Sequence, residues 1–254
     1  MLKKTTLLFT VLLGFSTLAH SQVLITLLFG DKLNSPNMEF GLHASANITT
    51  LSGIEGVNYA SNLNLGFFFG IRLSDKWSLH PELYVKSTSG AKNLPTYAIG
   101  DPDNPELDPI LLDADLERKI GYFQLPVLVR YKLKYGIAIE AGIQPSLRTK
   151  VRDVFTDQIV TKDDFQYTNE RNDDFNRLDF GLTGGIAWRL RKDGKGMVII
   201  ARYTQGLVNT LKDNTGSPQK NSGFAIGALI PIGVKKAEAD RAAKAVEEAE
   251  GEEE

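Results

Sequence analysis

Apolar and polar side chains alternate along residues 120–150. In the first half of this stretch, one parity is apolar or aromatic at every position from Phe123 to Leu133, whereas the other parity is mostly polar or charged. After a short interruption near Lys134 the alternation resumes and continues to Leu147. Successive side chains of a strand point to opposite faces, so this pattern predicts a β-hairpin with one apolar face and one polar face.

The apolar face of this hairpin fits contact with lipid. The apolar parity runs for about ten residues without a charge, which is the length that a tilted strand needs to cross hydrocarbon. The polar parity carries Arg130, Glu140 and Arg148 at mid-strand, where a soluble core would hold Val or Leu. A soluble eight-stranded barrel of the lipocalin type needs its apolar parity inside. The polarity therefore favours a barrel whose exterior meets a membrane.

Eight segments share this alternation. They are residues 38–47, 63–73, 77–87, the two halves of the central hairpin, 178–189, 197–207 and 223–234. Long polar connections (49–62, 89–118, 152–176 and 209–221) alternate with short turns at 74–76, near Lys134 and at 191–196. Outer-membrane barrels have short periplasmic turns and long external loops. The prediction is an all-β fold, an eight-stranded antiparallel transmembrane β-barrel with long extracellular loops, short periplasmic turns and both termini in the periplasm.

The chain of 254 residues divides into four predicted parts. Residues 1–21 have the features of a secretory signal peptide, namely Lys3 and Lys4, an apolar core at 7–15 and small residues before a cut at Gln22; an N-terminal membrane anchor is the alternative. Residues 22–37 form a periplasmic lead-in or a plug, 38–234 the outer-membrane barrel, and 235–254 an acidic periplasmic tail. No later stretch approaches 18 consecutive apolar residues, so we expect no further membrane helix.

Composition narrows the function classes. There is no cysteine, which excludes a disulfide scaffold, a thiolate metal site and a cysteine nucleophile. Closing a barrel gives every backbone polar group a partner without disulfides. The tail holds four basic and eight acidic groups of a chain with net charge −2, so the barrel region is close to neutral. No basic field exists for binding nucleic acid.

Charged residues fall repeatedly on the parity predicted to face the barrel interior. The predicted interior network is Glu39, His43, Arg72, His80, Glu82, Lys86, Arg130, Lys132, Glu140, Arg148, Asp179, Arg189 and Arg202. The interior of an eight-stranded barrel is just wide enough to be filled by side chains, and opposite charges confined there should pair. One reading is a salt-bridged plug that stiffens the barrel, and the other is a narrow or gated pore.

His43 and His80 both fall on the inward parity, near Glu39 and Glu82. Such a set can form a metal site or a His–carboxylate catalytic pair, but interior hydrogen bonding is the expectation. The chain has no HExxH spacing, nucleophile elbow, P-loop or dinucleotide fingerprint. We therefore predict no catalytic residue, no metal and no cofactor. An envelope enzyme with residues scattered among the loops is a distant alternative.

Acidic residues gather in two of the long loops. Asp101, Asp103, Asn104, Glu106 and Asp108 lie in one, and Asp163, Asp164, Asp173 and Asp174 in the next. Calcium prefers such oxygen ligands, but the spacing and the glycine of an EF-hand are absent. Solvated acidic loops are the expectation, with calcium as the alternative.

Aromatic residues lie near predicted strand ends, where interface girdle residues occur. They are Trp77, Tyr122, Tyr131, Tyr135, Trp188 and Tyr203. Ordinary strand aromatics are the alternative. The Ala/Glu-rich tail lacks an apolar stripe, so we expect a solvating segment or a contact for a periplasmic partner.

Several segments resemble one family. GYFQLPVLVRYKL, EAGIQPSL, FGLTGGIAWRL and ARYTQGL, together with LLFGDKLNS after the predicted signal, are similar to segments of the PorT-like outer-membrane β-barrels, the "porin family" small barrels of the Bacteroidota. The resemblance covers about residues 23–234. It implies an outer-membrane barrel without enzymatic activity. Some relatives belong to a protein-secretion machinery, but no residue here carries that role over.

The sequence therefore predicts a non-enzymatic barrel in the outer membrane of a Gram-negative bacterium. Its expected role is structural or interaction-based, with a charged plug inside and lipid around it. Envelope or secretion-machinery proteins are the expected partners. A narrow, gated small-solute channel is the alternative.

Overall fold

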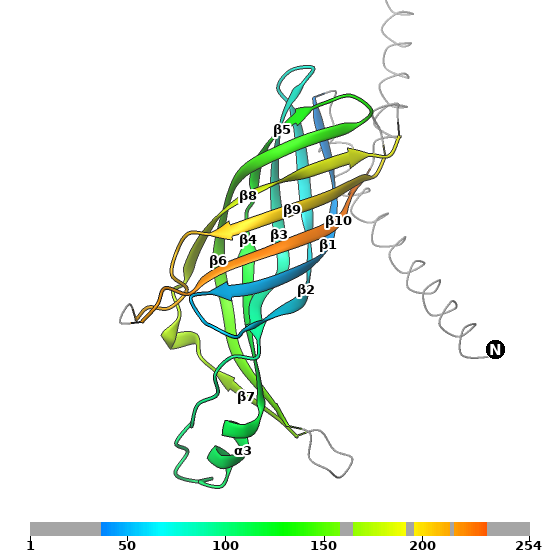
Figure 1. Ribbon diagram of the computed structural model, residues 1–254. Coiled ribbons are helices and arrows are strands. Elements are labelled where there is room, and N and C mark those ends of the chain that lie inside the picture. The colour runs from blue at the N-terminus through cyan, green and yellow to red at the C-terminus, as the bar shows by residue number, and fades with distance from the viewer. Residues whose placement is uncertain (1–36, 158–164, 192–195, 214–215, 233–254) are drawn as a thin grey trace, which may run out of the picture.

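The computed structural model describes residues 37–157, 165–191, 196–213 and 216–232, and these residues form one antiparallel sheet that closes on itself (Figure 1). Its strands are β1 (Met38–Ser52), β2 (Asn58–Arg72), β3 (Trp77–Lys92), β4 (Asp115–Gln124), β5 (Val127–Lys132), β6 (Ile137–Asp157), β7 (Phe165–Glu170), β8 (Leu178–Arg189), β9 (Val198–Gly206) and β10 (Lys220–Pro231). The first strand pairs with the last, which closes the ring.

The ring has eight wall strands, although ten strands are labelled among the described residues. β4 and β5 form one wall strand interrupted at Leu125 and Pro126, and both pair with β3 and β6. Pro126 has no N–H to donate to a ladder, and its carbonyl instead accepts a hydrogen bond from the Glu82 amide at 2.8 Å. β7 pairs only with β6 and lies beyond the wall. The predicted eight-stranded antiparallel barrel is confirmed.

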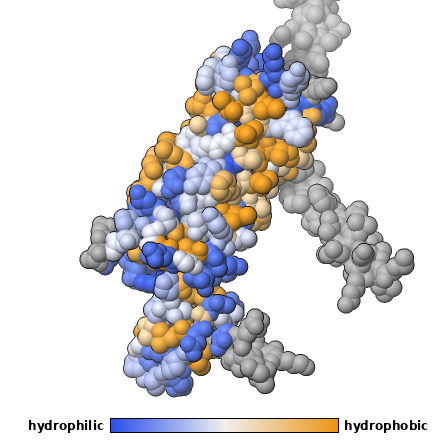
Figure 2. All heavy atoms as spheres, viewed as in Figure 1, coloured by the Kyte–Doolittle hydropathy of each residue, from blue (hydrophilic) through white to orange (hydrophobic). Residues whose placement is uncertain are grey.

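The outward parity of the wall is apolar. Exposed side chains include Ile139, Leu182, Ile186 and Ile226, the last at 67%. Figure 2 shows apolar side chains spread across the visible wall of the barrel. Buried side chains on the inward parity include His43, Glu82, Glu140 and Arg202. Because successive residues face opposite sides of the sheet, the alternation predicted from the sequence separates the two faces.

β3 breaks this alternation at a bulge. Its register with β2 and β4 shifts between Tyr84 and Ser87, so Val85 and Lys86 are both exposed and Ser87 is buried. A bulge adds one residue to one strand and reverses the facing of all that follow. The parity read from the sequence is therefore wrong from Lys86 onward in β3.

The strands are longer than predicted at the long-loop end. Residues 49–62, predicted as a loop, mostly continue β1 and β2, which leaves a connection of residues 53–57. Gly53 and Gly56 take positive φ angles there (83° and 74°), a backbone region that glycine enters without steric cost. The predicted loop 152–176 contains the end of β6 and β7, followed by the 3-10 helix η2 (Asn172–Asp174).

These extensions form a folded cap at the end of the barrel, together with helix α3 (Leu107–Asp113) (Figure 1). The cap has an apolar core, which consists of Leu51, Ala91, Leu94, Leu111, Ala114, Leu116, Ile120, Tyr122, Val151, Phe155 and Phe175. A second, smaller apolar cluster lies among inward residues toward the short-turn end: Phe68, Ala138, Ala187, Val198, Ile200 and Leu229. No helix in the described part of the chain is long and apolar enough to cross a bilayer.

Candidate functional site

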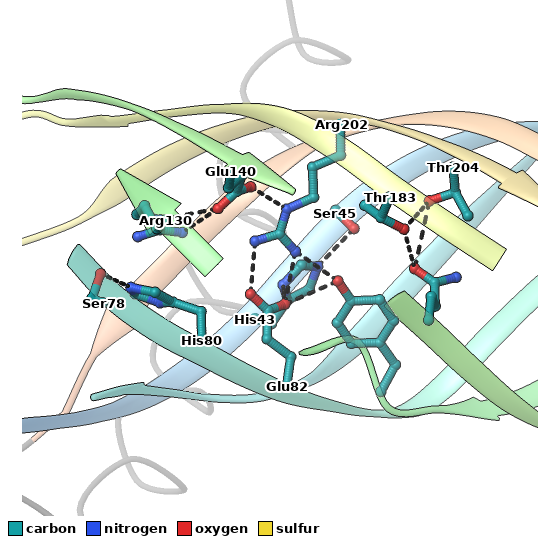
Figure 3. Close-up of polar contacts among 12 residues, drawn as sticks. His43, Ser45, Ser78, His80, Glu82, Arg130, Glu140, Thr183, Arg202 and Thr204 are labelled. Atoms are coloured by element: carbon teal, nitrogen blue, oxygen red, sulfur yellow. Dashed lines mark hydrogen bonds and ion pairs between the residues drawn. The ribbon is translucent and has the colours of Figure 1, made fainter. Parts of the chain in front are cut away.

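A network of buried charges crosses the barrel lumen (Figure 3). Arg202 on β9 lies between Glu82 on β3 and Glu140 on β6. Its Nη2 and Nη1 donate to the two carboxylate oxygens of Glu82 at 2.7 and 2.8 Å, and its Nε donates to Glu140 Oε1 at 2.5 Å. Such charge-assisted, bidentate contacts are the strongest class of hydrogen bond in proteins. One guanidinium therefore ties opposite walls of the barrel together.

Arg130 on β5 completes the charge balance. It donates from Nε and Nη2 to Glu140 Oε2 at 2.9 and 2.7 Å, and Arg130 and Glu140 are directly opposite residues of paired strands. Two arginines and two glutamates thus form a neutral set, which offsets the cost of burying each charge.

Gly185 makes room for this network. It lies opposite Arg202 on β8, and a Cβ atom there would sit 2.4 Å from the Ala201 carbonyl oxygen and 2.9 Å from Arg202 Cγ. Since real Cβ atoms do not approach other atoms so closely, only glycine fits without displacing the arginine.

His43 joins the network on β1. Its Nδ1 lies 2.9 Å from Glu82 Oε2, its Nε2 lies 2.9 Å from Ser45 Oγ, and its ring packs on Tyr84 at 4.3 Å between centroids. The order Ser45–His43–Glu82 is that of a serine nucleophile, a base and an orienting carboxylate. However, Glu82 is engaged by Arg202 and Ser45 is 3% exposed, so no substrate reaches the hydroxyl in this arrangement.

His80 does not join His43 in a shared site. Its Nε2 lies 3.0 Å from Ser78 Oγ on the same strand. Across the described residues, no three His, Asp or Glu side chains are grouped so that they could hold a metal ion. Each interior histidine thus has one ring nitrogen within hydrogen-bond distance of a serine hydroxyl on its own strand.

The other residues of the predicted interior set lie in three environments. Glu39 and Arg189 form a half-buried ion pair at 2.7 Å. Arg148 donates to the Asn176 carbonyl oxygen and to Asn172 Oδ1 in the cap. Asp179 is half-buried in the lumen wall.

Three residues predicted to face inward are exposed: Arg72, Lys86 and Lys132. Lys86 follows the β3 bulge, and Arg72 and Lys132 end their strands near the short turns. Arg72 and Lys132 are therefore exposed at strand ends, and Lys86 is exposed on the outer face of β3.

The aromatic residues predicted for a girdle are mostly exposed. Trp77, Tyr135, Trp188 and Tyr203 are 48%, 89%, 50% and 39% exposed. Trp77 packs against Tyr131 with ring centroids 4.7 Å apart. Tyr122 is an exception, because it is 3% exposed and its hydroxyl accepts a hydrogen bond from Asn221 inside the barrel.

A polar cavity of about 60 Å³ lies on the cap side of the charged network. Its walls carry mainly amide and hydroxyl side chains: Asn47, Thr49, Asn64, Ser89, Gln124, Gln144, Ser146, Thr204 and Asn221, with Tyr84, Asp179 and Arg202. The predicted interior network contains the charged members Asp179 and Arg202 but none of the neutral ones. Their signal was present, because neutral polar residues recur on the same inward parity as the charges.

The cap contains a second arginine–carboxylate cluster, which sequence reasoning did not find. Asp153 is fully buried and accepts two hydrogen bonds from Arg118, at 2.7 and 2.6 Å. The Tyr97 hydroxyl donates to the same carboxylate at 3.0 Å, and Arg171 Nη1 lies 3.5 Å away. Partial burial and the charge of Asp153 raise the pKa of Tyr97. Nothing local in the sequence marks these residues as neighbours.

The carboxylates of the first acidic loop hold the loop backbone. Asp101 accepts hydrogen bonds from the Asp103 amide and the Asn104 side chain, which lower its pKa. Asp108 accepts hydrogen bonds from the amides of Ile99 and Gly100. These carboxylates therefore shape the loop. In the second acidic loop, Asp174 pairs with Arg171, whereas Asp163 and Asp164 lie outside the described residues.

Some predictions concern parts of the chain outside the described residues. These are the signal peptide at 1–21, all but the last residue of the lead-in or plug at 22–37, and the acidic tail at 235–254. They stay predictions.

The sequence model of one family, described as "Outer membrane protein beta-barrel domain", matches residues 32–212. No curated protein matches the chain. Among solved structures, Ail, the attachment invasion locus protein of Yersinia pestis, is similar with 7% identity and a TM-score of 0.40 over 77% of this chain and 98% of that one. Neisserial surface protein A is similar with 13% identity and a TM-score of 0.39, over 75% of this chain and 96% of that one. OprG of Pseudomonas aeruginosa is similar with 13% identity and a TM-score of 0.36, over 77% of this chain and 93% of that one.

Proposed function

Because the chain belongs to the outer membrane protein beta-barrel domain family and is an outer-membrane barrel, we propose that it has a structural or protein-interaction role in the cell envelope and no enzymatic activity. The barrel is closed to solutes by a charged plug. Its short turns and both termini face the periplasm, and its cap faces outward. Within the family it belongs to the PorT-like small barrels.

One observation carries the proposal of a closed lumen. Arg202 bridges β9 to both β3 and β6 through contacts of 2.5–2.8 Å, and Arg130 holds Glu140 from the neighbouring strand. Phe68 and Leu229, which are fully buried, fill the interior toward the short turns. An eight-stranded barrel has no spare width beside such side chains.

The cap supports an interaction role. Outside the lipid-facing band, a folded unit with its own apolar core presents α3, the β6–β7 hairpin and the preceding loop to the medium. Loops held on a rigid scaffold are a common location for binding. Cross-linking in intact cells, followed by mass spectrometry of peptides joined to Lys119 or Lys150, tests whether envelope or secretion-machinery proteins lie against it.

Planar-bilayer recording of the refolded protein tests closure. We expect no steady conductance from the wild type. The double variant Glu82→Ser with Arg202→Ser removes opposite charges together and leaves the Arg130–Glu140 pair intact. Combined with Phe68→Ala, which opens the apolar cluster toward the short turns, it should conduct if it folds. A steady open state in the wild type would establish the alternative.

That alternative, a narrow gated channel for small solutes, rests on the polar cavity on the cap side of the network. A gate would have to part Arg202 from Glu82 or Glu140. Voltage-dependent openings of the wild type that become more frequent in Glu82→Gln, which weakens the contact with Arg202 without changing the size of the side chain, would support this second function.

A further inference from the structure

Asp179 differs from the other carboxylates of the lumen. Glu39, Glu82 and Glu140 each pair with an arginine at 2.5–2.7 Å. Asp179 accepts hydrogen bonds from the Phe180 amide at 2.7 Å and from Asn221 Nδ2 at 2.6 Å, yet no Lys, Arg or His of the described chain forms an ion pair with it. Its negative charge is left without a positive partner.

Unpaired oxygen atoms lie in the same cavity. Asn47 and Asn221 line it and are 6% and 9% exposed, and the Oδ1 atom of each is buried without a hydrogen-bond donor. Asn221 donates from Nδ2 both to Asp179 and to the Tyr122 hydroxyl, at 2.9 Å. These two contacts fix the orientation of the Asn221 amide, whose nitrogen contacts Asp179 while its oxygen has no donor. Buried hydrogen-bond acceptors are rarely left without a donor in native proteins.

Arg202 also lines the cavity, but it is already paired with Glu82 and Glu140. A bound cation would supply positive charge to the remaining oxygen atoms. Water could donate to the amide oxygens, but it would not balance the carboxylate. A calcium or magnesium ion would carry more charge than one carboxylate balances, and Asp179 is the sole acidic residue among the described residues that line this cavity. Hard cations prefer oxygen ligands such as carboxylate, carbonyl and water, and a monovalent ion matches the charge of a single carboxylate. A volume of about 60 Å³ has room for an ion with a few waters.

We propose that this cavity binds one alkali-metal cation, held by the carboxylate of Asp179 and the side-chain oxygen of Asn221. The remaining ligands come from water and from hydroxyl groups of the lining. Asp179 stands on β8 and Asn221 on β10, so the cation ties together two strands that flank β9. The site does not depend on whether the barrel conducts.

Urea unfolding of the refolded protein in detergent micelles tests the site. The midpoint is measured in sodium, potassium and N-methyl-D-glucamine chloride at equal ionic strength, because the last cation is too large for the cavity. At about ten times its dissociation constant, the bound ion should raise stability enough to shift a thermal midpoint by roughly 3–5 °C, with a matching rise in the urea midpoint. Asp179→Asn should give one midpoint in all three salts.

Asp75→Asn is the matched control, since it removes the same charge from an exposed turn. It should keep the cation dependence of the wild type. Equal wild-type midpoints in all salts would overturn the proposal and leave water, or a protonated carboxyl group, in the cavity. Equal cation effects in wild type and Asp179→Asn would also overturn it, because the ion would then bind elsewhere.

Crystals grown or soaked with thallium(I) give a readout that does not depend on a variant that folds. An anomalous peak beside Asp179 and Asn221 supports the proposal, and its absence at full soaking overturns it. Conductance is a separate measurement, so an open wild-type channel would remove the proposed plug function without touching this site.

Discussion

The two halves of β6 bury opposite kinds of side chain. In the barrel wall, Ile139 and Ile143 are 50% and 42% exposed while Glu140 is buried. In the cap, Lys150 and Arg152 are exposed, whereas Val151 and Phe155 are fully buried. One continuous strand therefore buries a charged side chain and exposes apolar ones in the wall, and does the opposite in the cap.

The difference reflects the medium around each half. Where hydrocarbon surrounds the strand, apolar side chains gain nothing by turning inward, and ionic groups must be enclosed and paired. Where water surrounds it, burying apolar surface stabilises the fold. Even so, each half of β6 contributes a carboxylate to a buried ion pair, Glu140 with Arg202 in the wall and Asp153 with Arg118 in the cap. Variants can show whether the two contacts contribute equally to the free energy of unfolding.

The largest effect is expected from Arg202→Met. The substitution leaves Glu82 and Glu140 without their shared cation inside the barrel, and breaking a buried pair costs about 3–5 kcal/mol. Reversible urea unfolding in lipid vesicles measures the loss in the free energy of unfolding. Arg72→Met, at an exposed strand end, is the control and should change it by less than about 0.5 kcal/mol. A loss below about 1 kcal/mol for Arg202→Met would show that the lumen is solvated, like the outside of the cap.

The barrel wall could be predicted from the sequence because apolar and polar side chains alternate along each of its strands with a period of two residues. This alternation distinguishes the lipid-facing side chains from those in the lumen. It is sufficient to predict that Arg130, Glu140 and Arg202 face inward. The rule failed at Lys86, where one inserted residue reverses the facing and no local signal marks the bulge.

The cap could not be predicted in the same way. Its core joins Leu51, Leu111, Val151 and Phe175 from four distant segments, and only tertiary structure brings them together. Polar residues in all of these segments, with glycines in 49–62 and prolines in 89–118, are typical of solvated loops. The partners of Asp153 illustrate the limit, since Arg118 and Tyr97 lie 35 and 56 residues away.

Ile226→Lys tests directly whether the outer face of the barrel contacts hydrocarbon. Ile226 stands on the outer face of β10 at 67% exposure, and a lysine near the middle of a membrane costs about 2–4 kcal/mol, falling to about 0–1 near the interface. The free energy of folding into lipid vesicles should become less favourable by that amount. Ser222→Lys lies four residues along the same face toward the long-loop end and should cost far less. Equal costs at both sites would mean that this face does not meet hydrocarbon.

Asp153→Asn should act on the cap alone. The change leaves Arg118 buried beside a neutral amide, and we expect a loss of about 1–3 kcal/mol. Because the cap has its own core, the loss should appear as faster proteolysis within residues 93–118 and 165–176, with the urea midpoint of the barrel unchanged. If the midpoint of the whole protein falls together with cap protection, the wall and the cap unfold as one unit, and the comparison between the halves of β6 concerns packing only.

Tyr97 gives the smallest expected effect and separates the cap from the wall by pH. Partial burial and the nearby Asp153 raise the pKa of Tyr97 above its ordinary value of about 10. A group whose folded pKa is raised stabilises the fold fully below the unfolded pKa, and this contribution is lost as the pH rises through the folded pKa. Subtilisin should therefore cut the cap faster as the pH rises above about 10. Tyr97→Phe, which loses one hydrogen bond to a carboxylate, should cost about 1 kcal/mol after allowance for its partial exposure and should flatten that alkaline rise. Parallel pH curves for the two proteins would assign the alkaline sensitivity to other groups.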